Sequence, residues 1–126
     1  MSKRGSGSSA RAGGGMARLE GTQEDVAKAK EIRQIANQAI DELIVSVKNT
    51  EKIFGKKLTE EAIERQEEIR KEINRADTVE LISELGGIKN HPGGAINYLN
   101  EVQTSRNGTL GKKMDAAYWR KYNAKR

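Results

Sequence analysis

The chain has 126 residues, a formal net charge of +5, one proline and no cysteine. This length suits one small domain, and the lack of cysteine excludes disulfides, a thiol nucleophile and cysteine-ligated metal sites. No run of about 18 apolar residues is present, which excludes a membrane-spanning helix. Few aromatic residues and a single proline disfavour a β-sandwich or barrel. We therefore expect an all-α protein.

Residues 1–21 form a basic leader rich in glycine, serine and arginine. Its first 18 residues contain no Leu, Ile, Val or Phe, so on its own it cannot bury enough apolar area to become ordered. Its hydroxyls, backbone amides and guanidinium groups could instead order against phosphate. A flexible or solubilising tail is the alternative interpretation.

The single helical domain is expected over residues 22–126, and its first helix follows Thr22, whose side chain can cap it. Apolar residues then recur every three or four positions, the spacing of a buried helix stripe: Val26, Ala29, Ile32, Ala36, Ile40, Leu43 and Val47. Ile35, Ala39 and Ile44 widen the stripe, which predicts contact with two neighbouring helices. The helix should end near Asn49–Thr50, or at Gly55.

A second helix, capped by Thr59, should form an antiparallel hairpin with the first, so that the hairpin covers about residues 22–85. Its narrow seam consists of Ala62, Gln66, Ile69, Ile73 and Ala76. Asp77 and Glu80 have capping-box spacing for a third helix, which either stands alone or continues the second with a bend. We expect the glutamates of residues 60–84 to lie on a solvated face, with an acidic docking surface as the alternative.

The glycine-rich loop of residues 86–94 is predicted to be a hinge that leads into two short helices. It lacks the spacing of a phosphate-binding motif. His91 is the only histidine, so no multi-histidine metal site can form, and we interpret it as a turn residue. We expect no metal, no cofactor and no catalytic residue.

Charge is distributed unevenly, with a net +4 over residues 1–18, −5 over 19–85 and +6 over 86–126. The C-terminal tract contains, besides its basic residues, the only tryptophan and two of the three tyrosines. Basic residues bind backbone phosphates and aromatic faces stack on unpaired nucleobases. Alternatively, the aromatic residues anchor a terminal helix in the core, or the helix docks on a protein or membrane surface. The candidate nucleic-acid-binding residues are Lys3, Arg4, Arg11, Arg18, Lys112, Lys113, Tyr118, Trp119, Arg120, Lys121 and Tyr122.

The opening Lys3-Arg4-Gly5-Ser6-Gly7-Ser8-Ser9-Ala10-Arg11 resembles the start of small accessory proteins encoded by phages and prophages. This resemblance implies a phage setting and transfers no site residue. We expect a non-enzymatic protein, in the cytoplasm of a bacterial host, that binds a nucleic acid or a nucleoprotein complex. An inhibitor of a host defence nuclease, as anti-CRISPR proteins are, is a concrete form of this expectation.

The alternative is a structural virion or assembly protein whose leader threads between subunits, and a transcription-associated module is a third hypothesis. We expect no membrane partner. A homodimer through the isoleucine-rich helix faces is a further expectation.

Overall fold

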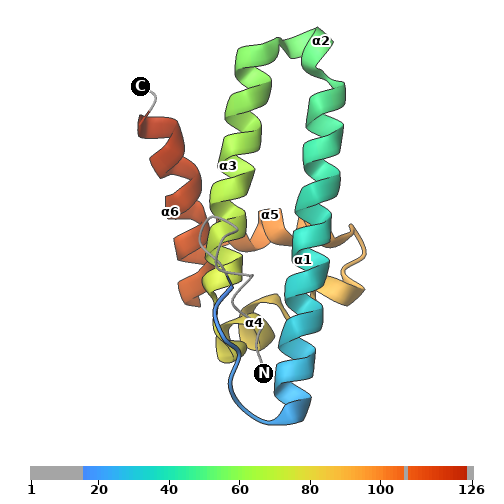
Figure 1. Cartoon of the computed structure of the whole chain (residues 1–126), viewed down its shortest axis with the longest axis vertical. Helices are drawn as coiled ribbons and strands as arrows, with labels where there is room; N and C mark the ends of the chain where they lie inside the picture. The colour runs from blue at the N-terminus through green and yellow to red at the C-terminus, as the bar shows by residue number, and fades with distance from the viewer. Residues whose placement is uncertain (1–15, 107, 125–126) are drawn as a thin grey trace, which may run out of the picture.

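The computed structural model describes residues 16–106 and 108–124, with side chains described as far as residue 120. Every regular element in these ranges is helical, in agreement with the expected all-α class. Helices α1 (Gln23–Asn49) and α3 (Lys56–Arg75) run antiparallel as a long hairpin, and the short α2 (Glu51–Phe54) closes its far end (Figure 1). None of the described helices has the length and apolar character needed to cross a membrane.

Helix α1 begins where its capping residue predicts, because the Thr22 hydroxyl accepts a hydrogen bond from the Asp25 amide at 3.0 Å. The middle of its apolar stripe is buried as expected, with Ala29, Ala36 and Ile40 fully inaccessible to solvent. The predicted members at the two ends, Val26, Leu43 and Val47, are half-buried. The stripe meets α3 on one side and α4 and α5 on the other. The width of the stripe predicted two neighbouring helices, and the structure has three, because α4 and α5 share the second side.

Helix α3 begins earlier than predicted, at Lys56, with Gly55 in the N-cap position. Gly55 has a φ of 92°, a conformation that glycine adopts without strain, so it reverses the chain between α2 and α3. Thr59 does not cap the helix, since its hydroxyl donates to the Gly55 carbonyl at 2.8 Å from inside the first turn. Within the predicted seam, Ile69, Ile73 and Ala76 are buried, whereas Ala62 and Gln66 are half-buried.

Helix α3 ends at Arg75, and extended backbone at Ala76 separates it from α4 (Thr78–Leu85). The predicted capping box is present: the Asp77 carboxylate accepts from the Glu80 amide, and the Glu80 carboxylate accepts from the Asp77 amide. The second and third predicted helices are therefore two helices, and not one with a bend.

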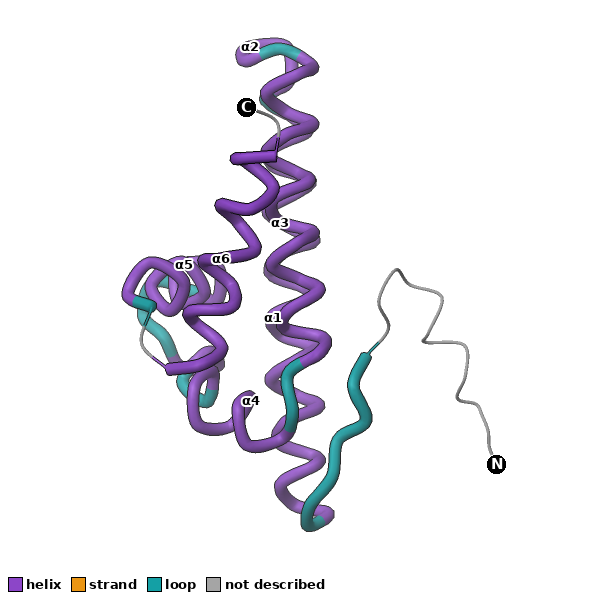
Figure 2. Tube along the Cα trace, turned by 90° about the vertical axis from the view of Figure 1, so that its left-hand side faces the viewer, coloured by secondary structure: helices purple, strands orange, loops and turns teal. Residues whose placement is uncertain are grey.

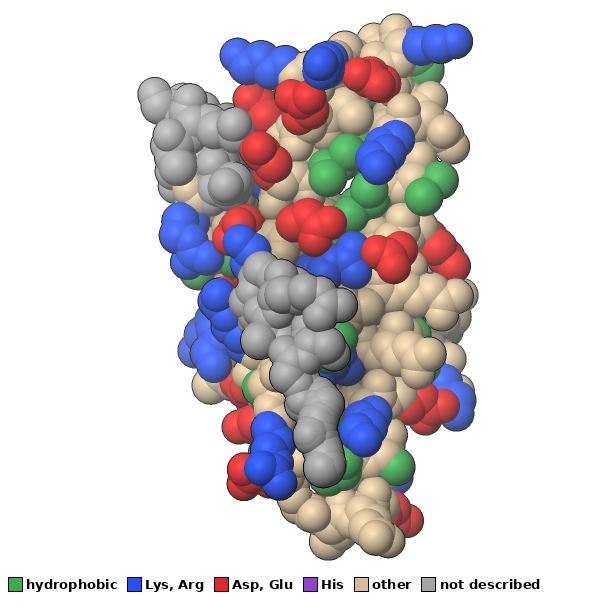
Figure 3. Space-filling model, viewed as in Figure 1, with side chains coloured by type: hydrophobic (Ala, Val, Ile, Leu, Met, Phe, Trp, Pro, Cys, Tyr) green, Lys and Arg blue, Asp and Glu red, His purple; other side chains and the backbone are tan. Residues whose placement is uncertain are grey.

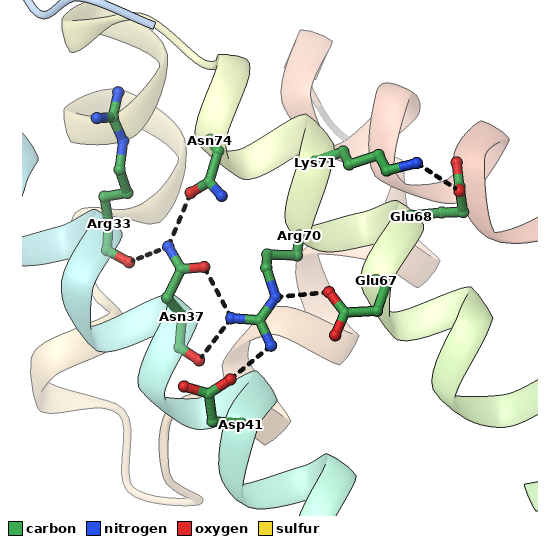
Figure 4. Close-up of polar contacts among 8 residues, drawn as sticks. All are labelled: Arg33, Asn37, Asp41, Glu67, Glu68, Arg70, Lys71 and Asn74. Atoms are coloured by element: carbon green, nitrogen blue, oxygen red, sulfur yellow. Dashed lines mark hydrogen bonds and ion pairs between the residues drawn. The ribbon is translucent and has the colours of Figure 1, made fainter. Parts of the chain in front are cut away.

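A polar network joins the two long helices on the face that the last helices leave uncovered (Figure 4). Arg70 of α3 donates to the Asp41 carboxylate at 2.6 Å and to the Asn37 side chain at 3.0 Å, both on α1. Asn37 also donates to Asn74 at 2.8 Å. These hydrogen bonds fix the register of α1 against α3 at the solvent-facing edge of the apolar contact between them.

The remaining helices, α5 (Ala95–Ser105) and α6 (Gly108–Ala124), pack on one side of the hairpin, and residues 16–21 run along the opposite side (Figure 2). The latter segment is tied to α3 by a hydrogen bond of 2.7 Å from the Ala17 amide to the Asn74 carbonyl. Leu19 packs against the core. The end of the predicted leader thus belongs to the packed body, while its residues 1–15 lie outside the described residues.

The predicted hinge is anchored at its centre. The 3₁₀ helix η2 (Ile88–Asn90) buries Ile88, and the Tyr98 hydroxyl accepts from the Gly87 amide while it donates to the Glu84 carbonyl. A side chain at Gly87 would meet the Tyr98 ring at 3.2 Å. The glycine here permits close packing of the loop on Tyr98.

The isoleucine-rich faces proposed for a homodimer are occupied inside the molecule. Their buried members form one core that joins the hairpin to the later helices: Ile32, Ile40, Ile44, Ile69, Ile73 and Ile88. A dimer through these faces would require that core to open.

Glu84 connects α4 to the start of α6. Its carboxylate accepts hydrogen bonds from the amides of Thr109, Leu110 and Gly111 at 2.8–3.2 Å, which satisfies three of the amides that a helix leaves unpaired at its beginning. Its negative charge also interacts favourably with the positive end of the α6 helix dipole. Gly108 must be a glycine, because a side chain there would approach this carboxylate to 2.6 Å.

We expect Glu84→Ala to lower the free energy of unfolding by about 1–2 kcal/mol, since it removes the cap of α6. Urea unfolding followed by circular dichroism measures this. The matched control is Glu42→Ala on α1, whose exposed carboxylate receives one long hydrogen bond from Gln38 and should change stability by less than about 0.5 kcal/mol. Equal effects of the two substitutions would contradict the capping role.

Candidate nucleic-acid interface

Helix α6 carries most of the predicted site and is fixed by three fully buried side chains, Leu110, Met114 and Ala117. Their spacing of four and three residues places them on one face, which packs against α3 and the core. The predicted nucleic-acid-binding residues of α6 are therefore divided around the remaining faces, some toward α3 and some toward solvent.

Two of the predicted basic residues pair with carboxylates of the same chain. The Lys113 ammonium lies 3.1 Å from the Glu80 carboxylate. The Arg120 guanidinium lies 3.6 Å from Glu68 and 3.9 Å from Glu72. These bases hold α6 against α3 and α4, so they are less available to phosphate than their position in the sequence suggests.

The glutamates of α3 do not all lie on a solvated face as expected. The side chains of Glu68 and Glu72 are only 15% and 13% exposed, because α6 covers them. Arg65 lies over the ring of Tyr118, 5.2 Å from its centre, and Tyr118 packs against the core. The α3–α6 contact therefore combines the buried apolar face of α6 with charged and aromatic pairs. Tyr118 has the core-anchoring role that was the alternative for the aromatic residues.

The environment of Glu80 stabilises its charged form. Burial alone would raise the pKa of this carboxyl, but hydrogen bonds from the Thr109 hydroxyl and the Asp77 amide, together with Lys113, outweigh burial and hold the pKa below its usual value. In return, the hydrogen bond and charge of Glu80 raise the pKa of Lys113.

The solvent side of α6 presents Trp119 and Lys112. Trp119 is 46% exposed, and its indole stands edge-on to the Tyr118 ring at a centroid distance of 5.2 Å. The indole N–H donates to Asp115 at 3.1 Å, which limits the orientation of the ring. Lys112 is exposed and makes no ion pair with any side chain that the structure describes.

Arg106 joins this surface from α5, a residue that the sequence did not single out. It caps α5 in the left-handed conformation, with a φ of 54°, and its guanidinium lies 3.9 Å from Asp115. Asp115 also accepts a hydrogen bond from Gln103 of α5 at 3.2 Å. Only the pairing of α5 with α6 brings Arg106 near Trp119, and nothing in the local sequence signals that pairing.

The predicted residues do not form one continuous interface in the described structure. Arg18 is exposed on the segment that runs across the hairpin from α6 (Figure 2). Lys3, Arg4 and Arg11, and the side chains of Lys121 and Tyr122, lie outside the described residues. Lysine and arginine side chains do gather along the edge that α6 occupies, whereas acidic and basic side chains alternate elsewhere on that face (Figure 3).

His91 has the turn role predicted for it. Its Nδ1 accepts a hydrogen bond from the Gly93 amide at 3.0 Å, so in the neutral ring Nε2 carries the proton and donates to Glu101 at 3.2 Å. Across the described ranges, no cluster of three or more histidine, aspartate or glutamate side chains is arranged to hold a metal ion.

Comparison with protein-family models, with curated proteins and with solved structures gives no match to this chain.

We expect Glu80→Gln to lower the free energy of unfolding by about 1 kcal/mol at pH 7, because it weakens the bonds to Lys113 and Thr109. The pKa of Glu80 is lower in the folded state than its unfolded-state value of 4.5, so its charge stabilises the folded protein at pH values above 4.5. This stabilisation is lost as the pH falls through the folded-state pKa. The stability difference between wild type and variant should therefore shrink below about pH 4.5. Urea unfolding between pH 7 and pH 3 measures it, and a difference independent of pH would contradict the assignment.

Proposed function

We propose that this chain is a non-enzymatic accessory protein of the phage type that binds a nucleic acid or a nucleoprotein complex. Inhibition of a host defence nuclease, in the manner of an anti-CRISPR protein, is the concrete form we favour, and the site of action would be the bacterial cytoplasm. The observation that carries the proposal is the solvent-facing side of α6, where an exposed tryptophan lies among lysine and arginine side chains.

Three features of this surface support contact with nucleic acid. Trp119 is exposed although the core of this protein contains few aromatic side chains, and an exposed indole can stack on an unpaired base. Asp115 orients both the indole and Arg106, which reduces the entropy lost on binding. Lys112 adds a charge that phosphate can neutralise, and the basic residues after 120 continue the same tract.

The anionic surface of α3 limits how a nucleic acid could lie on the molecule. Glu68 and Glu72 are neutralised in part by Arg120, but exposed acids such as Glu60 and Asp41 would repel a strand laid along the hairpin. We therefore propose contact along the outer edge of α6, away from the hairpin face. The remaining acids are suited to the basic channel of a nucleic-acid-binding partner protein.

A structural or assembly protein is the second candidate function. It is favoured by one observation, a group of exposed apolar side chains at the far end of the hairpin, which a purely nucleic-acid-binding surface does not require. In this alternative the basic leader threads between subunits.

We expect the full chain to bind single-stranded RNA or DNA more weakly as salt rises from about 50 to 200 mM, because phosphate contacts release counterions. Trp119→Ala should weaken binding by about five- to 150-fold at fixed salt, the range expected for loss of one stacking aromatic. Fluorescence anisotropy with labelled 20-nucleotide strands measures both effects.

The control is Val45→Ala, which truncates an exposed apolar side chain on α1 and should leave this affinity unchanged. Circular dichroism verifies that both variants retain their helices. Binding that does not depend on salt, or that Val45→Ala weakens as much as Trp119→Ala does, would reject the α6 surface as the contact.

A further inference from the structure

The end of the hairpin exposes apolar side chains ringed by lysine. We call residues 48–58 the hairpin tip. Ile53, Phe54 and Leu58 are 75%, 59% and 57% exposed, and Phe54 is the only phenylalanine of the chain. The tip also contains four exposed lysines, Lys48, Lys52, Lys56 and Lys57. Its single acidic residue is Glu51, so the tip is basic within an otherwise acidic stretch of the chain.

The tip projects beyond the helices that cover the rest of the hairpin. Arg65 of α3 lies over the ring of Tyr118, and α6 continues toward the tip for six residues beyond Tyr118, as far as Ala124. Helix α3 continues for nine residues beyond Arg65, so it extends past the end of α6 by roughly 5 Å at 1.5 Å per residue, and α2 lies at this projecting end (Figure 1). Three large apolar side chains on such a protrusion are typical of an interaction site.

A hollow with the complementary properties lies on the same chain, between α4, α5 and the start of α6. It has a volume of about 540 Å³. Tyr98 and Val102 give it an apolar wall, and the 68%-exposed side chain of Glu101, which also contacts His91, supplies negative charge at the rim. Glu84 lines the hollow too, with its carboxylate directed at the amides of α6. Ser83, Ser105 and Gly108 complete its lining. We call this site the α5 hollow.

We propose that the hairpin tip of one copy docks in the α5 hollow of a second copy. The apolar side chains of the tip would lie against Tyr98 and Val102, and its lysines would approach Glu101 at the rim. The volume of the hollow accommodates one aromatic side chain with a neighbouring aliphatic one. The second copy is the partner of choice because the basic apolar tip and the hollow with an apolar wall and an acidic rim both belong to this chain.

The positions of the two surfaces determine the geometry of the assembly. The tip lies at one end of the molecule, whereas α4 lies near the other end and α5 crosses near the middle of the hairpin, so a chain cannot fill its own hollow (Figure 1). A contact between two unlike surfaces is head-to-tail, and it produces a ring or an open chain of copies in place of a symmetric dimer. This inference is independent of the nucleic-acid contact proposed for α6.

Sedimentation velocity of the full chain without nucleic acid tests the proposal. A contact this small is weak, so we expect the average size to rise between about 10 and 500 μM protein, and to fall with added salt as the lysine–glutamate attraction is screened. Phe54→Ala and Glu101→Lys should each weaken self-association by about tenfold or more. Met16→Ala and Glu42→Lys are matched controls, an exposed apolar residue and an exposed glutamate outside both surfaces.

Mixing the two defective variants provides the decisive result. Phe54→Ala retains an intact hollow and Glu101→Lys retains an intact tip, so together they should form a one-to-one complex that grows no further. Triple substitution Lys52→Gln, Lys56→Gln and Lys57→Gln should reproduce the tip defect without altering helix content. A chain that stays monomeric throughout, association that both variants leave intact, or a mixture that remains monomeric would each overturn the proposal.

Discussion

The structure depends on the burial of α3 along two of its faces by chemically different contacts. One face packs its isoleucines, Ile69 and Ile73, against α1. The other receives α6 through carboxylates, an arginine and a tyrosine ring. Both contacts are necessary because α3 is rich in charge. The apolar seam against α1 does not neutralise the glutamates on the other face of α3. Helix α6 supplies the opposite charge, and the cap from Glu84 sets the direction in which α6 leaves the core.

This arrangement changes what the basic C-terminal tract is available to do. Lys113 and Arg120 stabilise the fold by pairing with glutamates, and Tyr118 packs inward. What remains toward solvent is a smaller surface around Trp119 and Lys112, which Arg106 joins through Asp115. A second exposed surface, the hairpin tip, contributes lysines and apolar side chains at the opposite end of the hairpin from α4. The two surfaces suit different kinds of partner.

The sequence predicted those features that neighbouring residues decide. The Thr22 cap, the Asp77–Glu80 capping box and the buried stripe of α1 all follow from short-range spacing, and each is present. It could not predict the cap that Glu84 places on α6, because the partners are more than twenty residues apart. The burial of Glu68 and the approach of Arg106 to Asp115 likewise depend on which helices pack together. Within the candidate site, the pattern identified basic and aromatic residues without separating those that face inward from those that face solvent.

The central claim is that some basic residues of α6 form ion pairs that stabilise the fold, while others face solvent and contact nucleic acid. Two adjacent lysines test it. Lys112 faces solvent, whereas Lys113 pairs with Glu80. The measurement is the slope of log affinity for nucleic acid against log salt concentration, for Lys112→Gln and Lys113→Gln. The account predicts that Lys112→Gln reduces the slope by about 0.7–0.9 at unchanged stability, and that Lys113→Gln lowers stability by up to about 1 kcal/mol at an unchanged slope. Equal slope losses in both variants, or a loss in Lys113→Gln alone, would contradict it.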